Sequence, residues 1–92
     1  MDKNPAIGIR EHIRIIVTTA PTLLFTDDSG RHAVVMYNEG PDAVMIGHSG
    51  TVATLGTTLA ANQSLSDNYS RDAWWAILDA GATGTVSGFK VI

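Results

Sequence analysis

Turn-forming residues recur about every 8 to 12 residues along this chain, and no other feature constrains its fold as strongly. Aspartate and serine bond to their own backbone in turns, and glycine accepts a positive φ there. Between these turns lie short runs rich in β-branched residues, a spacing typical of a sandwich or barrel. The turns lie at Asp27–Gly30, Glu39–Asp42, Ser49–Gly50 and Gly81–Gly84.

The runs between the turns predict short β-strands. Ile13, Ile15 and Val17 alternate with polar residues, as a half-buried strand requires, although Ile16 makes the other face partly apolar. The continuous apolar run from Ala33 to Tyr37 predicts a strand covered on both faces. We expect strands over residues 12–18, 22–26, 31–38, 43–48, 62–68, 72–79 and 85–92, with a weak hairpin of residues 51–55 and 57–60.

Only residues 69–80 compete as a helix. Two adjacent tryptophans, Trp74 and Trp75, would diverge from a helix, whereas in a strand they point to opposite faces. A strand is therefore favoured. One tryptophan then faces the core and the other an interface, or both are buried in a strand that is covered twice.

The chain of 92 residues is long enough for one domain. We expect residues 1–11, which include Ile7 and Ile9, to be a flexible N-terminal arm. Residues 12–92 then form one all-β domain, a small antiparallel β-sandwich or jelly-roll-like barrel. The chain has no cysteine, so disulfides and thiolate metal sites are excluded, and oligomerisation is the remaining means of stabilising so small a domain.

Low charge narrows the classes of partner. Charged residues make up 16% of the chain, against about 25% in typical soluble domains, and the net charge is −3. Nucleic-acid binding is disfavoured because it requires a basic face. No apolar run approaches the roughly 20 residues needed to span a membrane, and no signal peptide is visible at the start.

No catalytic or metal-binding motif is present. His12, His32 and His48 lack the spacing of local metal sites, and Asp27 and Asp28 fit a turn better than a calcium loop. There is no Gly-x-Ser-x-Gly nucleophile elbow. We therefore expect no catalytic residue, no cofactor and no metal, and a protein that is not an enzyme.

Four segments carry a resemblance to a known class of proteins. They are residues 31–40 (RHAVVMYNEG), 42–47 (DAVMIG), 56–65 (GTTLAANQSL) and 72–77 (DAWWAI), followed by a glycine-rich turn and a closing strand. In this order they resemble small β-sandwich virion proteins of tailed bacteriophages, of the head-decoration (cement) or fibre-base type. The resemblance covers residues 18–92.

The resemblance implies a non-enzymatic protein without a cofactor that binds and stabilises the assembled capsid. Its partner would be the major capsid protein of a phage shell, and it would assemble as a homotrimer. It would be made in the host cytoplasm and reside on the capsid surface of the virion. The candidate interaction residues are Ile7, Ile9, Tyr69, Trp74 and Trp75, with the arm ordering on the capsid.

Two other classes of function stay open. A receptor- or glycan-binding module of a phage fibre or tail would stack sugars on aromatic rings, and Tyr69, Arg71 and Trp74 are its candidate residues. A small enzyme of cupin-like shape would need a bound metal, and elemental analysis of the purified protein tests for one.

Overall fold

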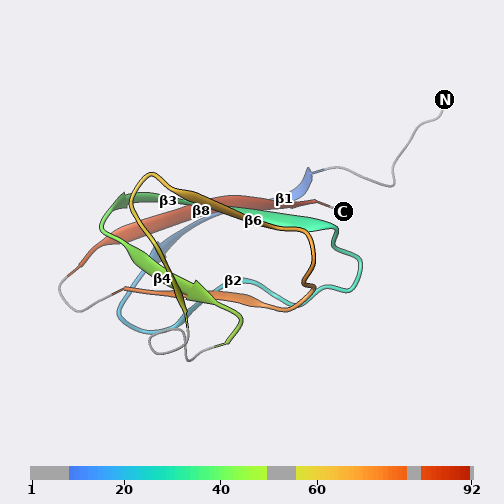
Figure 1. The fold of residues 1–92 in the computed structure, drawn as a ribbon, viewed down its shortest axis with the longest axis horizontal. Coiled ribbons are helices and arrows are strands. Elements are labelled where there is room, and N and C mark those ends of the chain that lie inside the picture. Colours follow the sequence, from blue (N-terminus) through green and yellow to red (C-terminus); the bar gives the residue numbers. More distant parts are fainter. Residues whose placement is uncertain (1–8, 50–55, 79–81, 92) are drawn as a thin grey trace.

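The computed structural model describes residues 9–49, 56–78 and 82–91, and these form two antiparallel sheets packed face to face (Figure 1). Sheet A has the strand order β1 (Ile9–Val17), β8 (Gly84–Val91), β3 (Ala33–Pro41) and β6 (Ser64–Asp67). Sheet B has the order β2 (Thr22–Phe25), β7 (Trp74–Ile77), β4 (Val44–Gly47) and β5 (Thr57–Leu59). The all-β sandwich predicted from the sequence is confirmed.

The observed strands lie close to the predicted ones. Strand β7 occupies the segment for which a helix was the alternative, so the strand prediction there is confirmed. Strand β1 begins at Ile9, three residues before the expected domain boundary at His12. Residues 9–11, assigned to the arm from the sequence, thus form the start of this strand. The predicted strand at residues 51–55 lies outside the described residues.

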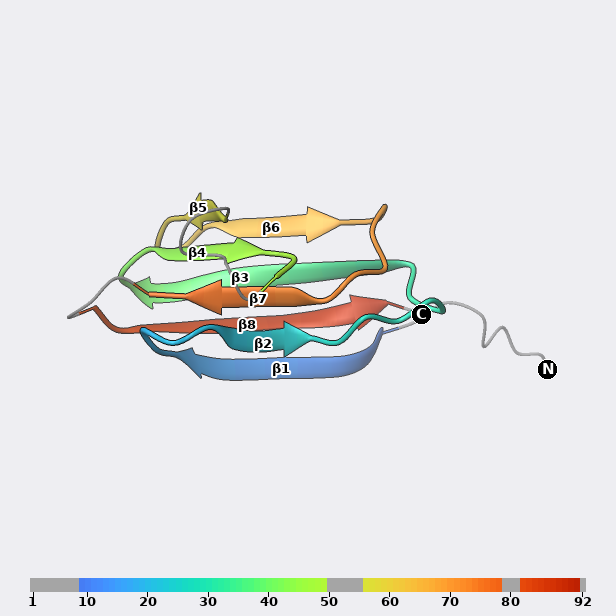
Figure 2. The ribbon, with the colours of Figure 1, turned by 90° about the horizontal axis from the view of Figure 1, so that it is seen from below.

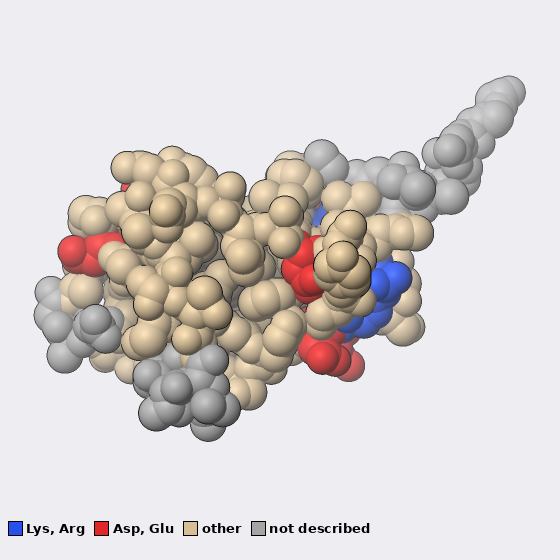
Figure 3. Space-filling model, viewed as in Figure 1, with Lys and Arg blue, Asp and Glu red and all other residues tan. Residues whose placement is uncertain are grey.

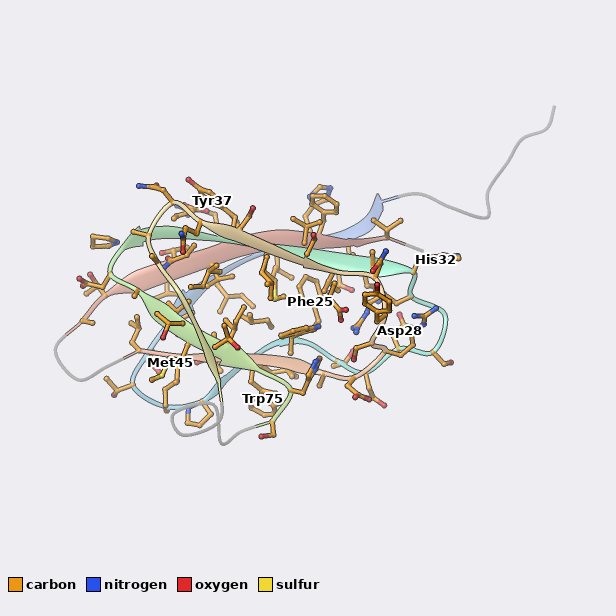
Figure 4. The ribbon with its side chains drawn as sticks, in the orientation of Figure 1. Phe25, Asp28, His32, Tyr37, Met45 and Trp75 are labelled. Carbon is orange, nitrogen blue, oxygen red and sulfur yellow. The ribbon has the colours of Figure 1, made fainter. Side chains whose placement is uncertain are left out.

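The core lies between the two sheets, where alternate residues of each strand point inward. Val34 and Met36 of β3 are completely buried, as are Val86 of β8 and Ala76 of β7. Figure 4 shows Phe25 between the sheets, whereas Tyr37 and Trp75 point away from them. The core cluster comprises Val17, Leu24, Phe25, Val34, Met36, Val44, Ile46, Leu59, Trp74, Ala76, Leu78 and Val86.

Strand β3 departs from the sequence prediction, because only one of its faces is covered. Val35 is half-buried and Tyr37 is 37% exposed, while the alternate residues Val34 and Met36 face the core. Among the described segments, no further layer packs over this side of sheet A. Val35 and Tyr37 lie on the outer surface of sheet A, beside Phe89 and Ser87 of β8. The run is continuous because its outward residues are apolar or aromatic like its inward ones. The prediction of a strand buried on both faces is therefore wrong.

Consecutive strands lie in opposite sheets, apart from β4 and β5, so the chain crosses repeatedly from one layer to the other. Arg31 joins two of these crossings. Its fully buried guanidinium donates to the carbonyl oxygen of Thr26 in the β2–β3 connection at 3.2 Å. It also donates to the carbonyl oxygens of Ser70 and Asp72 in the β6–β7 connection, at 2.9 and 2.8 Å.

Asn38 joins two crossings at the opposite end. Its side-chain amide donates to the carbonyl oxygens of Asp42 and Leu59, both at 2.9 Å, and its Oδ1 accepts the N–H of Gly40 at 2.8 Å. Asp42 lies in the β3–β4 connection and Leu59 is the last residue of β5, so this fully buried side chain bonds to both. The backbone N–H of Asn62 in the β5–β6 connection donates to the carbonyl oxygen of Asn38 at 2.7 Å. Because Asn38 uses both side-chain donors and its acceptor, its burial leaves no polar side-chain atom unpaired.

Gly88 lies where β8 and β3 approach most closely. A β carbon at Gly88 would overlap the carbonyl oxygen of Val35 and would lie 3.2 Å from Cα of Met36. Both neighbours are backbone atoms of a paired strand, so neither can move aside without disturbing the sheet. The centre of sheet A therefore requires glycine at this position.

We predict that Gly88→Ala lowers the free energy of unfolding by about 1–3 kcal/mol, the range for overpacking a filled interior. Gly30→Ala is the matched control, since the new β carbon would meet only Oδ1 of Asp28 at an ordinary 3.5 Å. Urea denaturation of the two variants measures the difference. Equal stability of the two would show that sheet A has room at Gly88.

Candidate functional site

The register of the strands assembles the outer face of sheet A, most of whose side chains are uncharged. One row across the strands is His12, Phe89, Val35 and Ser66, since each residue pairs with the next. A second, parallel row is Arg14, Ser87, Tyr37 and Ser64. We define this outer face by His12, Arg14, Ile16, Val35, Tyr37, Glu39, Ser64, Ser66, Thr85, Ser87, Phe89 and Val91.

Apolar and aromatic groups on the outer face are open to solvent. Ile16 is 74% exposed and Tyr37 is 37% exposed, and both lie on this one face. The rings of His12 and Phe89 lie side by side, with centroids 5.9 Å apart. The Tyr37 hydroxyl donates to Oδ1 of Asn62 at 3.1 Å, which fixes the position of its ring.

Among the described residues, one ion pair lies on the outer face. Arg14 donates through Nη2 to Oε1 of Glu39 at 2.9 Å and through Nε to Oε2 at 3.1 Å. This two-pronged hydrogen bond raises the pKa of Arg14 and lowers the pKa of Glu39. Both groups are therefore ionised at neutral pH, and together they leave the outer face without net charge.

A second group of charged side chains lies at one end of the sandwich. Lys90 donates to Oδ2 of Asp28 at 2.8 Å and lies 3.2 Å from Oε1 of Glu11. In the view of Figure 3 most of the described surface is uncharged, acidic side chains lie toward both ends, and the basic side chains lie toward the end where Figure 4 labels Asp28.

The structure separates the tryptophan pair. Trp74 is 7% exposed and belongs to the core, where its ring lies 4.0 Å from that of His48. Nδ1 of His48 is 3.0 Å from the carbonyl oxygen of Ala73, which fixes this ring over Trp74. Trp75 is half-buried on the outer side of sheet B, beside Leu23 and Gly47. The alternation expected of a strand is confirmed, and the alternative with both rings in the core is wrong.

The remaining candidate residues are Tyr69, in the connection just before β7, and Ile7 and Ile9 near the start of the chain. Tyr69 is 89% exposed in the β6–β7 connection, next to Arg71, which donates to the carbonyl oxygen of Tyr69 at 3.0 Å. Ile9 pairs with Val91 at the start of β1. Ile7 lies outside the described residues. The structure therefore does not bring these candidates together into one site.

A hollow of about 450 Å³ opens beside His48, where β6 of sheet A faces β4 and β5 of sheet B. Three polar residues, His48, Ser49 and Thr57, contribute to its wall, and the remaining lining is apolar. Trp74 contributes its ring to the floor. The lining residues are Ile46, Gly47, His48, Ser49, Thr57, Leu65 and Trp74.

The described residues contain no group of three or more histidine, aspartate or glutamate side chains that could hold a metal ion. His12 lies on the outer face of sheet A, His48 lies over Trp74, and the backbone N–H of His32 donates to the carbonyl oxygen of Val91 at 2.7 Å. Within the part of the chain that the structure describes, no helix is long and apolar enough to cross a membrane.

The outer face was not predicted from the sequence as a surface for binding. Its members come from four strands, and only the pairing register shows that Ile16, Tyr37 and Phe89 share one surface. One signal was present in the sequence, because Ile16 breaks the alternation of apolar and polar residues in the first strand. That break marks an apolar side chain on a face that the core does not use.

Comparisons with known proteins found no match. No protein-family model matches the chain, and no curated protein or solved structure shows significant similarity to it.

We predict that Trp74→Ala lowers the free energy of unfolding by about 3–5 kcal/mol, the range for removing a large aromatic ring from a core. Trp75→Ala should cost clearly less, since its ring is already half in contact with water. Urea denaturation followed by circular dichroism measures both. A larger loss for Trp75→Ala would contradict the inward orientation of Trp74.

The Asp28–Lys90 pair predicts a pH dependence of stability. The hydrogen bond from Lys90, and after it that from the N–H of Gly30, lowers the pKa of Asp28. A carboxyl whose folded pKa is lowered stabilises the fold above its unfolded pKa of about 4, and this contribution is lost as the pH falls through the folded pKa. We expect Asp28→Asn to lose less stability than the wild type on acidification.

Asp27→Asn is the matched control. The Asp27 side chain is exposed and makes no hydrogen bond or ion pair with the described residues. Its acid dependence should follow the wild type in urea titrations at neutral and strongly acidic pH. A parallel acid loss in both variants would mean that the Lys90–Asp28 contact contributes nothing to stability.

Proposed function

We propose that this protein is a non-enzymatic structural component of a tailed-phage virion that binds the assembled capsid through the outer face of sheet A. The observation that carries the proposal is the composition of this face. It combines exposed Ile16 and Tyr37 with hydroxyl side chains and a single neutralised ion pair. The resemblance of residues 18–92 to decoration and fibre-base proteins supplies the class of partner.

A face of this kind suits contact with another protein. Centres of protein interfaces are depleted of charge and enriched in aromatic residues, since burying an unpaired charge is costly. On the outer face Arg14 and Glu39 are paired with each other, so covering them would not bury an unpaired charge. Serine and threonine hydroxyls can donate and accept hydrogen bonds, so they adapt to the polar groups of a partner surface.

Binding of this kind would stabilise a capsid through mass action. A protein that binds the assembled shell and not its free subunits shifts the equilibrium toward the shell. Many copies, each contacting neighbouring capsid subunits, would add their contributions and oppose the pressure of packaged DNA. No cofactor takes part in this mechanism. The resemblance also implies a trimer. A mass of three chains in solution would support the trimer, and a mass of two chains would contradict the trimer but not the capsid role.

We predict that Tyr37→Glu weakens capsid binding about tenfold or more, because it places an unpaired carboxylate in the centre of the contact. Tyr69→Glu is the matched control: it introduces the same charge at an exposed tyrosine of the β6–β7 connection, away from the outer face. Co-sedimentation with shells of the major capsid protein from the same phage genome measures both.

Three outcomes decide the proposal. Loss of binding with Tyr37→Glu alone supports it. Equal binding by both variants would overturn the outer face as the contact surface, and failure of the unaltered protein to bind shells would overturn the capsid role.

A fibre or tail module that binds glycans is the alternative in that last case. Trp74 is buried, so Tyr69 and Arg71 remain as its exposed candidates, and a glycan array tests it directly.

A further inference from the structure

Strand β1 is a long edge strand whose outer side is open. It is the terminal strand of sheet A, where it pairs with β8 on one side. It runs for nine residues, whereas the other edge strands, β6, β2 and β5, have four, four and three. Figure 2 shows β1 along one margin of the molecule, with the shorter β2 next to it in the other layer.

Alternate residues of an edge strand present unpaired N–H and C=O groups that can pair with another strand. Monomeric proteins block such edges with proline, lysine, bulges or short strands. Strand β1, with the sequence IREHIRIIV, has neither proline nor lysine, and its one irregularity lies at its start, between Ile9 and Glu11. From Glu11 to Val17 the pairing with β8 is regular, and no other described strand pairs with the outer side. The charged side chains Glu11 and Arg14 occupy only part of this stretch.

Apolar side chains accompany the open edge. Ile13 and Ile15 face the core but are only partly buried, in contrast to Val17, which is 2% exposed. Ile16, on the opposite side of the strand, is 74% exposed. A strand laid against β1 would cover all three isoleucines and the free backbone groups together.

We propose that two copies of this chain pair antiparallel through β1, about a two-fold axis at Ile15. A second copy fits this edge because a two-fold axis brings the same strand of both copies together. The N–H and C=O groups of each β1 then pair with those of the other. For both cores to lie on the same side of the joined sheet, the axis must be perpendicular to the sheet. Each residue then lies opposite a residue whose side chain points to the same face of the sheet. The possible registers therefore differ by two residues along the partner strand.

The charges on β1 select among these registers. An axis at Arg14 would set two arginines opposite each other, and an axis at Ile13 would set Glu11 opposite Ile15. With the axis at Ile15, Ile15 faces its own copy, Ile13 faces Val17, and Ile16 faces the aliphatic part of Arg14. Apolar residues then meet apolar ones and no like charges are opposed within residues 13–17, where the two β1 strands overlap. An axis at Ile16 would shorten this overlap to residues 15–17.

The pair would join the two copies of sheet A into one continuous sheet, with both outer faces on the same side. This inference goes beyond the proposed function and does not depend on it, because the pair forms from the free protein. A dimer in solution that fails to bind shells would refute the capsid role alone. A monomer that binds shells would refute the pairing alone.

Light scattering after size exclusion, over a dilution series, tests the pair. We expect a mass of twice the 9.7 kDa chain, dissociating on dilution. In the Ile16→Lys variant the lysine of each copy lies opposite Arg14 of the other copy, so each dimer contains two repulsive pairs. This variant should weaken the dimer about tenfold. Ile16→Glu places a carboxylate there and should preserve or tighten it. Urea denaturation verifies that both variants fold, since Ile16 contacts mainly solvent.

The sign of the charge makes this test specific. If Ile16 contributed only apolar contact, both substitutions would weaken association equally, and that result overturns the proposed register. A mass of one chain at every concentration, or of three chains, overturns the two-fold pair.

Cross-linking of single cysteines tests the register independently, because the chain contains no cysteine of its own. Directly opposed residues of antiparallel strands have Cα atoms about 4.5–5.5 Å apart, within reach of a disulfide. Ile15→Cys should therefore form a cross-linked dimer on mild oxidation. Ile13→Cys is the matched control, since the two copies of Ile13 lie four residues out of register. Cross-linking of Ile13→Cys alone, or of both variants equally, overturns the pairing as proposed.

Discussion

A buried arginine holds together the end of the sandwich at which two connections between the sheets meet. Arg31 is fully buried, and its guanidinium donates to three backbone carbonyls from the β2–β3 and β6–β7 connections. Burying a cation is costly unless it is hydrogen-bonded, and each carbonyl offsets part of that cost. Since strands of both sheets begin or end at these connections, the relative position of the layers depends on this one side chain.

The positions of the buried polar residues that join the connections also explain which surfaces remain available for binding. Arg31 and Asn38 satisfy polar backbone groups at the two ends of the sandwich, and Lys90 gathers Asp28 and Glu11 at one of them. The outer face of sheet A takes no part in closing the fold. Its exposed Ile16 and Tyr37, and the open edge of β1 beside them, are thus available for contacts between molecules.

Several features of the fold were predictable from the sequence because they are local. Turn residues and short β-rich runs placed the described strands within a few residues, and the adjacent tryptophans were assigned to opposite faces of one strand. The covering of β3 was predicted wrongly for the same reason. A run such as Ala33–Tyr37 looks alike whether its second face meets another layer or remains in contact with solvent.

The sequence by itself determined the all-β class, the absence of disulfides and the low charge, since these follow from residue types and their spacing along the chain. Tertiary structure alone decided that Phe89, Tyr37 and Ile16 share one face and that β1 lies at an edge. It also decided that Arg31 is buried among carbonyls. Strand pairing joins residues distant in sequence, and short strands with similar alternation are compatible with many pairing orders. Their order is selected by packing of the whole core and by a few long-range hydrogen bonds.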